Sequence, residues 1–390
     1  ESSAAEIARW TRRECRKPWQ DGRCLERNLV ALVGQVGIGR AMEVLDTLQR
    51  TDASVRQAGH ELAHGMGLAA YRSPETLAET FAACPATHGG GCLHGIVQGY
   101  FLSLMRQGHL PGTAEMDALC EPHRPAAFLF FQCAHATGHG LMAVHANHVP
   151  RSLRACDLAT DPFIRESCYG GVFMENIVLV THPHNTTGGH AATQDGAHDA
   201  HAGHGAAEEE WKAMDADDPL YPCSVVDARY QPSCYVMQTS ATMFLNGGDV
   251  MATARACETA PAAMVPICFG SLGRDLMALA AQDHRRSLAL CGRVAEMAGG
   301  RGGLWCMVGL VQNLVNLAAD ADEGMRFCRE VTTDAHKQEC YRAVGEIIYS
   351  LVSGDEERGR TCEGAEPGFV AACRRGAGLD PRPSTNTGSN

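Results

Sequence analysis

The sequence predicts an all-α protein built from helical hairpins that repeat about every 35 residues and are stapled by disulfides. Three observations predict this α-solenoid. The 18 cysteines occur in couples whose members lie 8 to 15 residues apart. Counted from Cys84, successive couples begin 34 to 37 residues apart, except for one interval of 67 residues. Most segments that follow a couple carry apolar residues at the helical spacing i, i+3, i+4 and i+7.

The cysteines are best explained by a disulfide within each couple. The chain contains no C-x-x-C and no C-x-x-C-H sequence, which argues against zinc ribbons, thioredoxin-like motifs and haem attachment. Disulfides form in oxidising compartments, so we expect a secreted or periplasmic protein. Spacing does not prove connectivity, and pairing within each couple is the simplest choice. The couples are Cys15 and Cys24, Cys84 and Cys92, Cys120 and Cys133, Cys156 and Cys168, Cys223 and Cys234, Cys257 and Cys268, Cys291 and Cys306, Cys328 and Cys340, and Cys362 and Cys373.

The second cysteine of a couple opens a long amphipathic segment. Those beginning at Cys268, Cys306 and Cys340 have the clearest helical pattern. A shorter helix then leads to the next couple, as we expect for residues 152–156 and 322–328. A period of this length is typical of stacked helical hairpins.

The chain divides into five parts on this scheme. Residues 1–36 are expected to cap the array, and residues 37–180 to form repeats that carry histidines. Residues 181–218 are an insertion rich in histidine and poor in apolar residues, so we expect a flexible excursion. Residues 219–380 complete the repeats, and residues 381–390 are expected to be a disordered tail.

One cysteine couple in each repeat of about 35 residues resembles the disulfide-stapled helical-repeat proteins of the Sel1-like and tetratricopeptide-like kind. The resemblance covers residues 84–373. It implies an architecture, a curved stack of helical hairpins, and no particular activity.

Charge and hydropathy limit the partners. The net charge of −12 argues against nucleic acid and anionic membranes as partners. No run approaches 18 apolar residues, so we expect no membrane span. A helical stack instead offers a concave face to a protein or peptide.

The sequence His60-Glu61-Leu62-Ala63-His64 is an H-E-x-x-H motif. On a helix, residues i and i+4 lie on the same face, so His60 and His64 can share one metal ion. Glu61 can then act as a general base on a metal-bound water. At these five positions the chain resembles zinc metallohydrolases of the H-E-x-x-H type, which implies the same roles for the three polar residues.

Histidines recur at matching places in the next repeats. His94 follows Cys92 by two residues, while His135 and His139 follow Cys133 by two and six. Later repeats lack these histidines, which points to a site confined to the N-terminal repeats. Glycines accompany the histidines and are expected mainly to let helices pack closely. They are Gly95, Gly99, Gly138, Gly140, Gly170 and Gly171.

The first repeat lacks its cysteine. If Ala58 takes the place of that cysteine, His60 and His64 lie two and six residues after it, as His135 and His139 lie after Cys133. Packed helices lie about 8–10 Å apart, so His60 and His64 can converge with His94 on the next helix. Three protein ligands and a water form a catalytic zinc geometry.

His135 and His139 belong to a helix one repeat farther along, which we expect to be too far away to share that ion unless the array is sharply curved. They are candidates for a second metal site, completed by Glu175 or a histidine of the insertion. The alternative is that they orient the ligands or bind substrate. The insertion histidines are His182, His184, His190, His198, His201 and His204.

Zinc is the preferred metal because of the glutamate in the motif. Copper comes second, because of the histidine-rich insertion and the oxidising compartment. Three functions stay open: a hydrolase-type metalloenzyme in which Glu61 activates water, a copper or zinc binding or delivery protein without catalysis, and an interaction scaffold.

Overall fold

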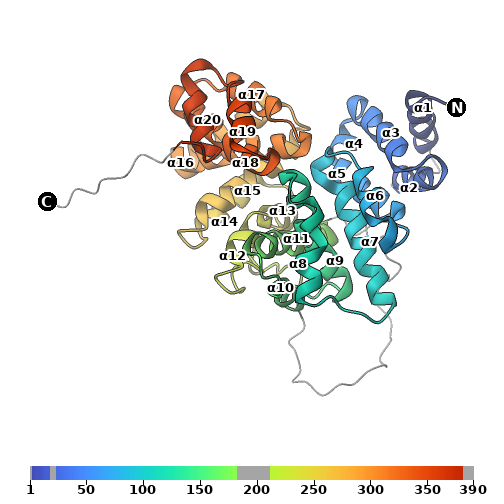
Figure 1. Ribbon diagram of the computed structural model, residues 1–390. Helices are drawn as coiled ribbons and strands as arrows, with labels where there is room; N and C mark the ends of the chain where they lie inside the picture. The colour runs from blue at the N-terminus through green and yellow to red at the C-terminus, as the bar shows by residue number, and fades with distance from the viewer. Residues whose placement is uncertain (1, 18–22, 182–210, 381–390) are drawn as a thin grey trace.

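The computed structural model describes residues 2–17, 23–181 and 211–380, which contain helices and no strands. The all-α prediction is therefore confirmed for these residues. Figure 1 shows the first helices in blue and the last in red on opposite sides of the molecule, with α7 to α13 between them. The α-helices are α1 (Ala4–Cys15), α2 (Cys24–Val36), α3 (Ile38–Thr51), α4 (Ala53–Gln57), α5 (Gly59–Ala70), α6 (Leu77–Ala82), α7 (Gly91–Arg106), α8 (Thr113–Cys120), α9 (Ala127–Val144), α10 (Val149–Cys156), α11 (Pro162–Thr181), α12 (Gln231–Tyr235), α13 (Gln238–Leu245), α14 (Val250–Glu258), α15 (Val265–Leu279), α16 (His284–Ala318), α17 (Ala321–Glu330), α18 (Asp334–Leu351), α19 (Asp355–Cys362) and α20 (Val370–Gly376), and the 3-10 helices are η1 (Pro74–Thr76), η2 (His88–Gly90), η3 (Glu121–His123) and η4 (Pro367–Phe369).

All nine predicted disulfides form between the members of a couple. Cys156–Cys168 ties the end of α10 to α11, and Cys328–Cys340 ties α17 to α18 in the same way. Each bond closes a loop of 8 to 15 residues, which stabilises the fold by about 2–3 kcal/mol through the lost entropy of the unfolded chain. Nine disulfides fit an extracellular or other oxidising compartment.

Helix α16 is the longest element and folds back on itself. The Cα atoms of Cys291 and Cys306 are 5.6 Å apart although 15 residues separate them, whereas a straight helix would place them about 22 Å apart. The reversal falls in the glycine-rich stretch 298–303, where a Cβ on Gly303 would lie 2.4 Å from the Cβ of Ala295. The helical hairpin expected for this couple is therefore present within α16.

The long helices pack against one another in chain order. Helix α5 packs on α7, α7 on α9 and α9 on α11, and the series continues through α13, α15, α16, α18 and α20. A single cluster of buried apolar side chains runs along the whole series. Each helix therefore buries its apolar face mainly against its neighbours in the sequence, as the amphipathic pattern predicts.

Four helix pairs approach so closely that their glycines meet the backbone of the partner: α5 with α7, α9 with α11, α15 with α16, and α18 with α20. A Cβ on Gly171 would lie 1.9 Å from the carbonyl oxygen of His135, and one on Gly138 would lie 2.2 Å from that of Cys168. Only glycine leaves room for such contacts. The packing role expected for these glycines is confirmed.

The same contacts correct the register predicted for the first repeat. In α9, α15 and α18, one backbone carbonyl lies against a glycine of the partner helix. This carbonyl belongs to the residue two positions after the helix's own cysteine, for example His135 after Cys133 in α9. The glycine of the partner lies three residues after that helix's own cysteine in these pairs, and in α7 this is Gly95, three residues after Cys92.

Gly95 meets the carbonyl of His64 in α5, so Leu62 occupies the place of the cysteine. The prediction that Ala58 does so is wrong by one helical turn. His64 is therefore equivalent to His135, and His60 has no counterpart among the later histidines.

Distant parts of the chain also meet. Helix α9 contacts α18, and η2 contacts α16. The side-chain amide of Gln57 donates to the carbonyl of Ala278 over 3.2 Å, and the backbone N–H of Ala127 donates to Ser353 Oγ over 2.9 Å. The series of helices thus curves back towards itself. Side chains of α9, α11, α15, α16 and α18 line a cavity of about 830 Å³.

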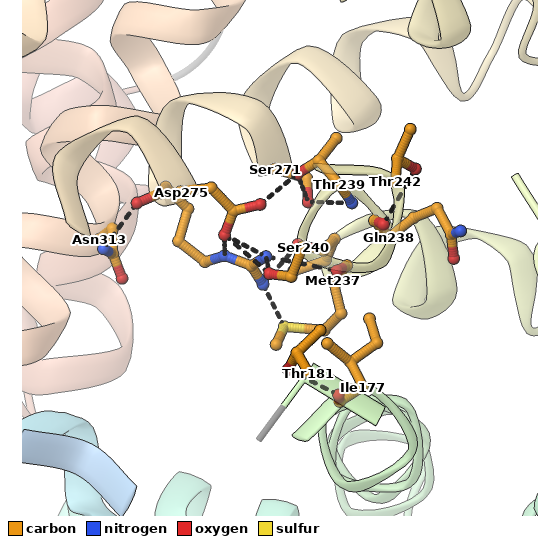
Figure 2. A network of polar contacts seen from close by, with 12 residues as sticks. Ile177, Thr181, Met237, Gln238, Thr239, Ser240, Thr242, Ser271, Asp275 and Asn313 are labelled. Atoms are coloured by element: carbon orange, nitrogen blue, oxygen red, sulfur yellow. Dashed lines mark hydrogen bonds and ion pairs between the residues drawn. The ribbon is translucent and has the colours of Figure 1, made fainter. Parts of the chain in front are cut away.

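One wall of this cavity is held by a polar network between α13 and α15 (Figure 2). Asp275 accepts hydrogen bonds from Thr239 Oγ1 over 2.7 Å and from Ser240 Oγ over 2.8 Å. Arg274 pairs with Asp275 over 2.7 Å and also donates to Ser240. The charges of this wall are therefore neutralised within it.

No helix among the described residues is long and apolar enough to cross a membrane. Most of the predicted insertion at 181–218 and the whole predicted tail at 381–390 lie outside the described residues.

Candidate metal centre

Four histidines of three consecutive long helices gather in one buried place. Helix α5 carries His64, α7 carries His94, and α9 carries His135 and His139. The ring centroid of His94 lies 4.9 Å from those of both His135 and His139. The rings of His64 and His139 are 5.4 Å apart. Histidines from three helices thus form one cluster.

The expectation that His135 and His139 lie too far from the earlier histidines is wrong. Glycine brings α7 unusually close to α5: a Cβ on Gly91 would lie 2.4 Å from the carbonyl oxygen of His60, and one on Gly95 would lie 2.0 Å from that of His64. The spacing of 8–10 Å on which the expectation rested applies to helices with larger side chains at the contact. Side chains of α5 and α9 therefore meet beside α7.

Each of the four histidines has a buried ring nitrogen without a hydrogen-bond partner among the described residues. These atoms are His64 Nε2, His94 Nδ1, His135 Nε2 and His139 Nε2. A buried polar atom left without a partner costs about 1–3 kcal/mol. Four such atoms in one cluster indicate a shared ligand that accepts nitrogen lone pairs, and a metal ion is such a ligand.

Neighbouring side chains hold two of these rings in the orientation that metal binding requires. His94 Nε2 lies 2.6 Å from Gln132 Oε1, and His139 Nδ1 lies 2.7 Å from Glu175 Oε2. Both oxygens accept, so the ring protons lie at His94 Nε2 and His139 Nδ1. The lone pairs at His94 Nδ1 and His139 Nε2 are left free. Metal-binding histidines typically donate their second N–H in this way.

The potential ligands form two groups. His94, His135 and His139 are the first, and His64, His139 and Glu175 are the second. Within each group the ligand atoms lie within 4.8 Å of one another. The groups share His139, which makes this residue the centre of the site. Imidazole and carboxylate suit zinc, copper, nickel and iron alike.

Burial keeps these imidazoles neutral. It lowers the pKa of His64 and of His139 to about 3, and neighbouring histidines add to the effect. The pKa values of His94 and His135 fall well below the usual value for the same reason. Burial also raises the pKa of the Glu175 carboxyl. Neutral imidazole is the form that binds a metal, so no proton competes with the ion at neutral pH.

We expect the metal-free protein to lose stability as the pH falls below about 6.5, the pKa of histidine in an unfolded chain. Between this value and a pH of about 3, the unfolded state binds protons that His64 and His139 cannot bind when folded. The free energy of unfolding therefore decreases as the pH decreases. Urea unfolding with a chelator at about pH 7.5 and 5.5, above the range where ordinary carboxylates titrate, measures this slope. Replacing His64 by asparagine should flatten the slope, and equal midpoints at both pH values would contradict the prediction.

The two remaining residues of the H-E-x-x-H motif belong to neither group of ligands. The ring of His60 lies 5.2 Å from that of His94, but its Nδ1 is hydrogen-bonded to the carbonyl of His88 over 2.8 Å. Glu61 shares a helix face with Gly65, which faces α2, and its Oε2 is buried without a partner among the described residues. The sequence predicted one trio of ligands, His60, His64 and His94. In the structure the potential ligands form two groups instead, and both groups contain His139.

Sequence reasoning missed Gln132, which lies three residues before His135 and so on the same side of α9. It also missed a pair beside the cluster, in which Nε2 of the buried His88 lies 2.7 Å from Oδ1 of the partly exposed Asp46. His88 adopts a left-handed backbone conformation with φ of 59°. The run of three glycines after His88 was the available signal, because such runs often mark an irregular backbone.

The chain was also compared with known proteins. No protein-family model matches it, and neither does any curated protein or solved structure. The chemistry of the site therefore has to be inferred from its own residues.

Proposed function

We propose that this protein is a secreted or periplasmic helical-repeat protein that binds a transition-metal ion at His94, His135 and His139. The observation that carries the proposal is the set of buried ring nitrogens without partners, to which each of these residues contributes one. Gln132 and Glu175 orient two of the rings, and the ring of His135 is hydrogen-bonded to the backbone of Ser167. Zinc is the preferred ion and copper the second.

A cavity beside the ion favours a metal-dependent enzyme. Three protein ligands leave one coordination position for water or substrate, the arrangement of catalytic zinc sites. His135 lines the cavity of about 830 Å³ together with Met174, Ile267 and Trp305. This volume is in the range of pockets that bind small molecules. The cavity therefore supports a metal-activated water acting on a largely apolar small molecule.

Burial favours a second candidate function, metal storage or delivery. The exposed fractions of His94, His135 and His139 are 1%, 7% and 1%, and a site closed to solvent retains its ion. The sequence after α11 contains six histidines, a composition that binds transition metals. An ion captured there would have only a short distance along the chain to Glu175.

Metal analysis separates these functions. After chelator treatment and reloading with zinc or copper, the protein is expected to retain at least one ion through gel filtration. The cobalt(II)-loaded protein should change its visible spectrum when azide is added, because azide occupies an open coordination position. Retention of no ion would refute the proposal, and an ion that does not respond to azide would favour storage.

The role of Glu61 is tested in the same preparation. Glu61→Gln is expected to retain the ion, because this residue belongs to neither group of ligands. If it is the base of a reaction, the variant keeps its metal and its azide response but loses turnover once a substrate is identified.

A further inference from the structure

The second group of ligands points to a second ion. We propose that the cluster holds two metal ions bridged by the ring of His139, an inference that rests on the first ion proposed above. The first ion is bound by His94, His135 and His139, and the second by His64, Glu175 and the other nitrogen of His139.

His139 has the geometry of a bridging ligand. Its Nε2 is buried and lacks a partner among the described residues, while its Nδ1 lies 2.7 Å from Glu175 Oε2. The two nitrogens point away from opposite sides of one ring. Glu175 is in the second group and absent from the first. Because Glu175 lies at Nδ1, we assign the Nδ1 side to the second ion and the Nε2 side to the first.

A site with one ion leaves the buried ring nitrogen of His64 without a partner among the described residues. Its Nε2 is the fourth buried ring nitrogen without a described partner, and its ring faces that of His139 at 5.4 Å. Yet His64 is grouped with Glu175 and not with His94 or His135. A second ion satisfies this nitrogen.

Glu175 also needs a cation. The exposed fraction of its side chain is only 12%, and its hydrogen bond with His139 is to a neutral ring whose side chain is 2% exposed. Its other described partner is the neutral amide of Gln98. A buried carboxylate without a cation is costly. A divalent ion between Glu175 and His64 supplies the missing positive charge.

Binding of the second ion displaces one proton. The proton on His139 Nδ1 leaves to solvent, the ring becomes an imidazolate, and each of its nitrogen lone pairs binds one ion. Glu175 changes from a hydrogen-bond acceptor to a metal ligand. No electron is transferred, and two divalent ions with one imidazolate and one carboxylate leave a net charge of +2.

Counting ions tests the second site. Wild type, Glu175→Gln, His135→Asn and the double variant are loaded with zinc and then passed through gel filtration. Each single variant should hold one ion fewer than wild type, and the double variant should hold two fewer, which a cluster with one ion cannot do. Differences from wild type cancel any ions bound by the histidine-rich insertion. Equal ion counts in wild type and Glu175→Gln, with a loss in His135→Asn, would refute the second ion and leave the first. Equal counts in all four proteins would refute both.

Copper tests the bridge without any substitution. Two copper(II) ions joined by one imidazolate couple magnetically, so the integrated EPR signal of copper-loaded wild type should fall well below its copper content. In Glu175→Gln, the signal should account for all the copper. A wild-type signal equal to the copper content at two ions per cluster would overturn the bridge. This readout remains decisive if a variant fails to fold.

Discussion

Replacing His139 by alanine is expected to abolish tight metal binding altogether. His139 is the one residue common to both groups of potential ligands, so its loss leaves two ligands in each. Loss of a residue that only orients a ligand typically costs 10- to 100-fold in affinity, and loss of a shared ligand should cost at least about 100-fold. Zinc and copper affinities, measured by competition with a chromogenic chelator, give the size of the effect.

A matched control is His109→Ala. His109 pairs with Glu115 at the surface, where about half of its side chain is exposed, and it belongs to neither ligand group. Its variant should bind metal as wild type does. Circular dichroism and a count of free thiols establish that both variants keep their helices and disulfides. Wild-type affinity in a folded His139→Ala protein would show that the cluster does not hold the ion.

Replacing Gly171 by alanine is expected to be the most damaging single methyl addition near the site. The new Cβ would lie 1.9 Å from the carbonyl oxygen of His135, so α11 must move away from α9. Overpacking of this kind costs about 1–3 kcal/mol and occasionally more. Because α9 carries His139 and α11 carries Glu175, metal affinity should fall together with stability. The urea midpoint and the zinc affinity measure the two effects.

Gly34→Ala is the matched control for this substitution. Gly34 lies in α2, where an added Cβ would meet nothing within 4 Å. The same change of residue should therefore stabilise the protein there by up to about 1 kcal/mol, since alanine is the better helix former. Midpoints that move in the same direction in both variants would show that the contact at Gly171 is not tight.

The glycine contacts also explain how this scaffold positions the buried histidine cluster. Helices α9 and α11 meet at a glycine contact, where the carbonyl oxygen of Cys168 meets Gly138. Each is also bonded by a disulfide to the shorter helix before it, Cys133 to Cys120 and Cys168 to Cys156. Helices held at two kinds of contact have little freedom to slide. The candidate ligands on them are therefore held in fixed positions, as a precise metal site would require.

The sequence by itself determined the parts of this protein that depend on local interactions. The nine disulfides join cysteines no more than 15 residues apart, so pairing within each couple was the simplest choice from the sequence, although spacing alone did not prove it. The histidines, too, were recognisable as candidate ligands from their helical spacing. His64, His94, His135 and His139 all lie in the cluster that the structure reveals.

Only the tertiary structure decided which histidines meet. Their grouping depends on the register of α5 along its axis and on the distance between helix axes. The register was predicted wrongly by one turn, because the cysteine that would mark it is absent from this part of the chain. The distance was overestimated, because backbone contacts at Gly95 and Gly171 bring the helices closer than ordinary side chains allow. Such contacts form between residues far apart in the chain, and no local pattern records them.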